Sequence, residues 1–196
     1  MESGSALQLF AVKHLPLNII FAERYALCAL RYANTEVLLR PRYKLFITLA
    51  AGVLVLDQVS KAVVSATLKM YEIRPVIQGF FNLTRVHNTG AAFGILAGQA
   101  SALRTGFFLA VSLVAMGVVL WMLYRLPPGQ KVELVALSLI LGGALGNVFD
   151  RVRLGEVVDF IDVYYRSYHW PAFNVADSAI SIGVILLLYR LVFAKE

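Results

Sequence analysis

Two aspartates stand beside long apolar runs in the C-terminal half of the chain. Asp159 lies in the stretch VVDF, and Asp177 ends the stretch FNVAD. An ionised carboxylate is costly next to membrane-length apolar sequence, so acids that are kept there are candidates for function. Two carboxylates that approach each other cannot easily both ionise, and such a pair can activate water and protonate a leaving group. The residue types therefore favour amide hydrolysis without a metal, if folding brings the two acids together.

Asp177 also has a simpler interpretation. It directly precedes an apolar segment, and an Asp at a helix N-terminus is often only a cap. The nearby Asn174 and the second acid on the same predicted membrane face favour the catalytic interpretation. Asp162 follows Asp159 in VVDFID, and we expect it to have no catalytic role.

Further polar residues interrupt apolar segments at helical spacing. Asp57 and Lys61 stand at i and i+4, so they can pair on one helix face, and a structural ion pair is the favoured interpretation. Asn147, Asp150 and Arg151 stand at i, i+3 and i+4 and share one face near the end of a later segment. For Arg151 two partners remain open, namely Asp150 or a backbone carbonyl of a substrate.

Glycines mark two other features. The stretch VHNTGAAFG, residues 86–94, is turn-like, and we expect a positive φ at Gly90. A plain turn and a substrate contact through Asn88 both remain open there. Gly142 and Gly146 form a small-xxx-small pattern, which allows two helices to approach closely.

Four apolar segments must position these residues. The chain is 59% hydrophobic and 15% charged, whereas soluble domains are about 45–50% apolar and about 25% charged. A soluble protein with a large core is disfavoured, because the apolar residues come in blocks long enough to cross about 30 Å of hydrocarbon. The predicted helices span residues 45–64, 105–126, 132–149 and 178–193.

The connections between these segments differ in length. The loop PPGQK, residues 127–131, is short and predicts an antiparallel helical hairpin. Residues 70–100 contain proline, glycines and β-favouring runs, which predict a small sheet or extended platform. Residues 151–177 form a second polar connection on the same membrane face. The predicted fold class is an α-helical membrane protein with four transmembrane helices and a small β-structured platform.

Residues 1–41 differ from the rest. Glu23, Arg24 and Arg31 interrupt their apolar patches, so no clean stretch of about 20 apolar residues appears. An interfacial amphipathic helix, an unstructured tail and a start codon assigned too early all remain open. We therefore separate an N-terminal extension, 1–41, from a four-helix membrane domain, 42–196.

Charge and cysteine content restrict the partners. The net charge is +6 and the pI is about 9.6, but the basic residues are scattered. This favours anionic lipid over nucleic acid as a partner. The two predicted membrane faces carry nearly equal numbers of Lys and Arg, so the charge distribution does not determine the orientation in the membrane. Cys28 is the single cysteine, which excludes an intramolecular disulfide and a cysteine-based metal cluster. The three histidines lie far apart and show no metal-ligand spacing: His14, His87 and His169.

A small transporter or channel subunit, with the acids along an ion or proton path, is the alternative function. It predicts polar residues deep in several segments, but segments 105–126 and 178–193 have almost none. A non-catalytic scaffold leaves two acids with Asn and Arg on one side unexplained. A lipid-phosphate hydrolase would require more His and Arg at the site.

Four boxes resemble those of the lipoprotein signal peptidases, the bacterial type II signal peptidases. They occur in the family's order over about residues 43–195: DQVSK (57–61), NTGAAFG (88–94), GGALGNVFDRVRLGEVVDFID (142–162) and FNVAD (173–177). The resemblance implies a membrane aspartyl protease of the bacterial inner membrane, with both termini in the cytoplasm and an extracytoplasmic β-structured cradle near the site. Such enzymes cut the signal peptide from diacylglyceryl-modified prolipoproteins just before the lipidated cysteine.

The resemblance also implies roles for individual residues. The catalytic pair maps to Asp159 and Asp177. Positions that line the site or hold substrate map to Asn88, Asn147, Arg151 and Asn174, and supporting positions map to Asp57, Lys61, Gly90 and Asp150. The resemblance implies inhibition by the cyclic peptide globomycin, and we expect a monomer in the bilayer without metal, cofactor or nucleic acid. Residues 1–41 have no family counterpart, so we expect that their deletion leaves cleavage intact.

Overall fold

A computed structural model of the chain describes residues 41–90 and 101–193. The chain divides into two units, Met1–Lys44 and Leu45–Glu196, and the arrangement given below is that of the second. The expectations for the N-terminal extension fall, apart from residue 41, outside the described residues.

The described part of the chain contains four long helices. Each is long and apolar enough to cross a membrane, by length and composition, which confirms the predicted fold class. They are α3 (Pro41–Thr67), α4 (Ser101–Arg125), α5 (Lys131–Leu154) and α6 (Val175–Phe193). The prediction ended the third helix at residue 149, because polar residues follow. In the structure α5 continues to Leu154, and Gly155, with a φ of 80°, forms a left-handed cap whose N–H donates to the Arg151 carbonyl.

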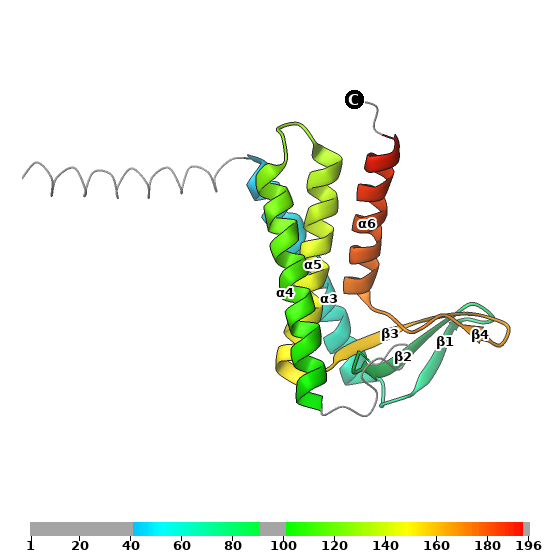
Figure 1. The fold of residues 1–196 in the computed structure, drawn as a ribbon. Helices are drawn as coiled ribbons and strands as arrows, with labels where there is room; N and C mark the ends of the chain where they lie inside the picture. Colours follow the sequence, from blue (N-terminus) through cyan, green and yellow to red (C-terminus); the bar gives the residue numbers. More distant parts are fainter. Residues whose placement is uncertain (1–40, 91–100, 194–196) are drawn as a thin grey trace, which may run out of the picture. The chain divides into compact units, whose positions relative to one another are not determined.

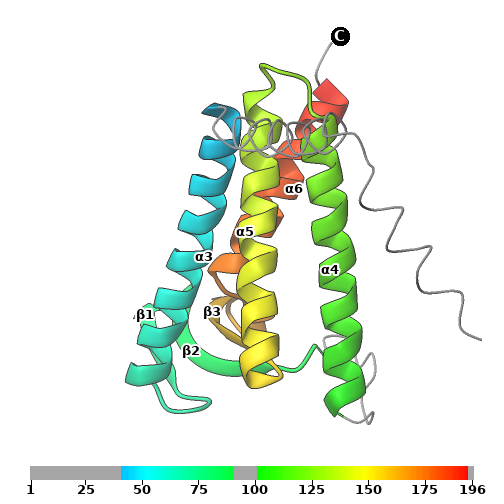
Figure 2. The same cartoon turned by 90° about the vertical axis from the view of Figure 1, so that its left-hand side faces the viewer.

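The central helix is α5. Half of its membrane-length window is buried, against 11% to 22% for the other three helices. Figure 2 shows α5 in front of α6, with α3 and α4 on either side. The predicted close approach at Gly142 is confirmed, because a Cβ there would lie 2.6 Å from the Ala50 carbonyl oxygen of α3. A polar side chain on the buried face of α5 is therefore enclosed by its neighbours.

The two longer connections build one antiparallel sheet. Its strands follow the order β1 (Ile73–Ile77), β2 (Phe81–Asn88), β3 (Val157–Tyr165) and β4 (Tyr168–His169). The sheet lies beside the start of α6, at the opposite end of that helix from its C-terminus (Figure 1). The predicted platform is thus present, and it also includes strands from the second connection. Pairing of β2 with β3 brings the NTG and VVDF stretches together.

Candidate active site

Asp159 lies in the middle of a buried strand. It is 1% exposed in β3, between the buried Val158 and Phe160. Antiparallel pairing places Asn88 of β2 diagonally across from it, and Asn88 Nδ2 donates a hydrogen bond to Asp159 Oδ2 (2.9 Å). Burial, and after it the negative charge of Asp177, raise the pKa of Asp159 to about 7. The carboxyl is therefore partly protonated at neutral pH.

Asp177 lies in the first turn of α6. Asn174 directly precedes the helix, and its Oδ1 accepts a hydrogen bond from the Asp177 backbone N–H (2.9 Å). In return, the Asn174 backbone N–H donates to Asp177 Oδ2 (3.3 Å), which completes a reciprocal capping arrangement. The predicted helix start at residue 178 was therefore too late. Asn174 is the cap, and the Asp177 carboxylate is held at the third position of the helix.

Asn174 also links the two acids. Its side chain is fully buried, and Nδ2 donates to Asp159 Oδ1 (2.7 Å) and to the Val158 carbonyl (3.3 Å). Because its backbone N–H holds Asp177, a single residue contacts both carboxylates. The two acids that the sequence placed on one membrane face belong to one hydrogen-bonded cluster.

A buried lysine, Lys61, connects to this cluster through hydrogen bonds. Lys61 Nζ pairs with Asp57 Oδ2 and with Asp150 Oδ2, both at 2.8 Å, so the predicted i, i+4 pair forms. It also donates to Asn147 Oδ1 (3.1 Å), and Asn147 Nδ2 in turn donates to Asp177 Oδ1 (2.8 Å). The lysine fixes which way the Asn147 amide faces, and the amide then presents its N–H to the Asp177 carboxylate.

The two acids beside Lys61 also hold backbone. Asp57 Oδ1 accepts a hydrogen bond from the Ala176 N–H (2.9 Å), so α3 supplies a cap for the first turn of α6. Asp150 Oδ2 accepts from the Val158 N–H (3.2 Å) at the start of β3. The two backbone segments that carry the candidate catalytic acids are thus tied to one ion-pair network.

Arg151 points to a different neighbour from Asp150. Its Nη1 donates to the Asn147 carbonyl (3.4 Å), and its guanidinium lies over the Phe108 ring, 5.5 Å from the ring centre. Of the partners expected from the sequence, Asp150 is engaged by Lys61 instead. Within residues 41–90 and 101–193, Arg151 forms no ion pair, so most of its donors are left for another acceptor.

The turn at Gly90 has the predicted positive φ, 83°. Its N–H donates to Asn88 Oδ1 (2.8 Å), which fixes the amide whose other end holds Asp159. A Cβ at Gly90 would overlap the Phe108 ring, so a side chain is excluded by space as well as by backbone conformation.

The sequence profile of Signal peptidase (SPase) II matches residues 49–193. The chain belongs to the signal peptidase II family. A lipoprotein signal peptidase from Geobacter sulfurreducens is 50% identical over 149 residues, which cover 76% of this chain and 92% of the relative. One from Cupriavidus necator is 51% identical over 144 residues, covering 74% of this chain and 81% of the relative.

Solved structures agree with this assignment. One, described as a bacterial membrane enzyme at 1.9 Å resolution, is 38% identical with a TM-score of 0.70 and covers 78% of this chain and 95% of its own. A second, at 2.3 Å resolution, is 37% identical with a TM-score of 0.69 and covers 78% and 92%. The chain is therefore a bacterial membrane peptidase of the aspartic class, and the profile match includes every residue of the cluster described above.

Two residues of the site were not predicted from the sequence. Gln58 Nε2 donates to Asp57 Oδ2 (3.1 Å), Asp150 Oδ1 (3.0 Å) and the Gly146 carbonyl (3.2 Å), and its place next to Asp57 was the available signal. Phe108 sits in an apolar segment where nothing distinguishes it. Across the described ranges, His, Cys, Asp and Glu side chains form no group of three or more placed to hold a metal ion.

Proposed function

We propose that the chain removes the signal peptide from diacylglyceryl-modified prolipoproteins, cutting just before the lipidated cysteine, with Asp159 and Asp177 as the catalytic pair. The name shared by relatives about half identical in sequence supports the substrate class. The observation that carries the assignment of the pair is the double contact of Asn174, through its side chain to Asp159 and through its backbone to Asp177.

In the proposed reaction the pair holds one proton. The ionised carboxylate takes a proton from a water molecule, whose oxygen attacks the scissile carbonyl carbon. The protonated carboxyl donates to the carbonyl oxygen, which becomes the second hydroxyl of a tetrahedral intermediate. When the C–N bond breaks, the proton taken from water passes to the leaving nitrogen, and one hydroxyl of the intermediate returns a proton to the other carboxylate, which restores the single proton of the pair. The raised pKa of Asp159 supports this scheme, because the pair can keep its proton at neutral pH.

The other site residues divide into two proposed groups. Asn88, Asn147, Arg151 and Asn174 would line the site, and Arg151, with donors to spare, would hydrogen-bond the substrate backbone. A peptide carbonyl held at the membrane surface needs such a donor, because an unpaired amide group there is expensive. Supporting positions would be Asp57, Lys61, Gly90 and Asp150, which hold the backbone and the amides around the acids.

The membrane setting completes the proposal. Both termini would lie in the cytoplasm, and the sheet would lie outside it, with the scissile amide delivered near the outer leaflet. The chain would act as a monomer in the lipid bilayer, independently of residues 1–41, and globomycin would block cleavage. Holding the substrate in the membrane would supply much of the rate through proximity.

Cleavage of a lipidated prolipoprotein, followed by gel shift, tests the catalytic pair. We expect Asp159→Asn and Asp177→Asn each to lower the rate by about 100-fold or more, the usual contribution of a positioned acid or base. Asp162→Asn is the matched control, because Asp162 is also a buried acid of β3 but contacts Asn82 and His169 instead. Full cleavage by either of the first two variants would refute the pair, and loss in Asp162→Asn alone would show that the wrong acid of VVDFID was chosen.

A further inference from the structure

A polar cavity lies beside the catalytic cluster. It has a volume of about 390 Å³ and lies between α3, α5 and the strands β2 and β3. Its lining includes Lys61 and Asp150 but neither Asp159 nor Asp177. The cavity thus touches the supporting ion-pair network while the candidate catalytic acids face elsewhere.

The cavity carries an excess of positive charge. Lys61 pairs with Asp57 and Asp150, both at 2.8 Å, so this network holds one more negative than positive charge. The lining also holds Arg85 and Arg153, and no carboxylate of the described residues lies within ion-pair distance of either guanidinium. The two guanidinium groups outweigh the surplus carboxylate of the Lys61 network, and neither forms an ion pair, which favours an anionic ligand.

Arg85 is held in place but keeps free donors. Its Nη1 donates to the carbonyls of Ser65 (2.9 Å) and Leu68 (3.3 Å), which caps the end of α3. This task uses only Nη1. Nε is buried and has no acceptor among the described residues, so it is closed to a ligand as well, whereas Nη2 donates to none of the described residues and is the donor that a ligand can reach. The guanidinium is therefore fixed in position while part of its fork remains available.

The position of the cavity along the spanning helices indicates the chemistry of the ligand. It lies where two spanning helices end, α3 at Thr67 and α5 at Leu154. The ends of such helices meet the polar headgroup region, where phosphate is the main anion. Arginine forks match the geometry of phosphate oxygens and bind them through charge-assisted hydrogen bonds.

We propose that this cavity binds a phosphate group through Arg85 and Arg153, presented either by a lipid headgroup or by free phosphate. The site does not include the catalytic pair, although it shares Lys61 and Asp150 with the network that supports that pair. A ligand there would bridge α3, β2 and α5 around the Lys61 network, so its first effect is on stability.

The test measures thermal unfolding of the full chain in detergent with three additives. These are short-chain phosphatidylglycerol, a diacylglycerol with the same acyl chains, and sodium phosphate. We expect phosphatidylglycerol or sodium phosphate to raise the midpoint by at least about 3 °C, and diacylglycerol to raise it less. A shift with the lipid alone identifies a headgroup as the source, and a shift with sodium phosphate identifies the free ion.

Variants locate the effect. Arg153→Gln and Arg85→Gln should each remove most of the shift, whereas Arg125→Gln, which removes the same charge at the far end of α4, should keep it. Because Arg85 also caps α3, Arg153→Gln is the decisive variant if Arg85→Gln folds poorly. No shift with either phosphate compound, an equal shift with diacylglycerol, or an undiminished shift in Arg153→Gln would overturn the proposal.

Discussion

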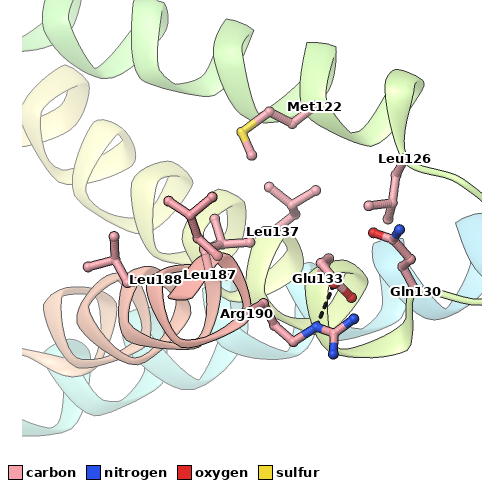
Figure 3. A pocket seen from close by; sticks show the side chains of 9 residues that line it. Met122, Leu126, Gln130, Glu133, Leu137, Leu187, Leu188 and Arg190 are labelled. Atoms are coloured by element: carbon pink, nitrogen blue, oxygen red, sulfur yellow. Dashed lines mark hydrogen bonds and ion pairs between the residues drawn. The ribbon is translucent and has the colours of Figure 1, made fainter. Parts of the chain in front are cut away.

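The two ends of α5 both carry ion pairs, and they differ in how those pairs are enclosed. Near its N-terminus, Glu133 accepts a hydrogen bond from Arg190 Nε of α6 (2.7 Å), beside an apolar groove lined by Leu137, Leu187 and Leu188 (Figure 3). The Arg190 side chain is 37% exposed. This pair joins two helices and contacts no other charged residue among those described.

Near the other end of α5, the charges are enclosed and shared. The side chains of Lys61, Asp57 and Asp150 are at most 5% exposed, and each forms more than one polar contact. Hydrogen bonds continue from Lys61 through Asn147 to Asp177. Ion pairing alone therefore does not distinguish a site in this membrane protein. The distinguishing feature is a buried network whose remaining donors and acceptors hold the backbone and amides around two acids.

The largest loss of stability and activity is expected when the buried cation Lys61, near the C-terminal end of α5, is removed. Lys61→Met leaves Asp57 and Asp150 buried without their counter-charge, which costs about 3–5 kcal/mol, and it releases the Asn147 amide. We expect the midpoint of thermal unfolding in detergent to fall sharply and cleavage to be lost. A Lys61→Met protein with normal stability and cleavage would show that the network is dispensable.

The sequence could predict the apolar helices, the Asp57–Lys61 pair and the positive φ at Gly90, because each depends on residues near in sequence. The meeting of Asn88 with Asp159 depends on the register of β2 against β3, which no local pattern determines.

The missed features have the same cause. The double contact of Asn174 requires α6 to begin at Val175, three residues before the predicted residue 178. A prediction from hydropathy misses this start, because the first turn of the helix contains the polar Asp177. Phe108 is one apolar residue among many in α4, and only packing places it beneath the Arg151 guanidinium. Long-range pairing and packing decided what the sequence left open.

A smaller effect is expected where α5 meets α3. In Gly142→Ala the new Cβ would lie 2.6 Å from the Ala50 carbonyl oxygen, so backbone must shift. Overpacking of this kind costs about 1–3 kcal/mol, and the thermal midpoint should fall accordingly. Gly117→Ala in α4 is the matched control, since nothing lies within 4 Å of its added Cβ. Equal midpoints for the two variants would contradict the close helix contact.

The smallest effect is expected at the Glu133 end. Arg190→Met removes a cation just as Lys61→Met does, but the side chain is partly exposed and the pair is isolated. Glu133 is mostly buried and loses its partner, so we expect stability to fall by about 1–2 kcal/mol, less than for Lys61→Met, which uncovers two buried acids, and cleavage to stay normal. If Arg190→Met lowers stability and cleavage as much as Lys61→Met, burial of the ion pairs does not explain the difference between the two ends of α5.

If Asp159 and Asp177 work as a pair that holds one proton, the pH dependence of kcat/KM should show the loss of that proton. Raising the pH through the Asp159 pKa of about 7 removes that proton, so cleavage should fall on the alkaline side. Asn88→Ala deletes a hydrogen bond that lowers this pKa, so the fall should move to higher pH even if the rate is reduced. A profile that is flat from about pH 5 to about pH 9, or an alkaline limb that stays in place in Asn88→Ala, would contradict the account.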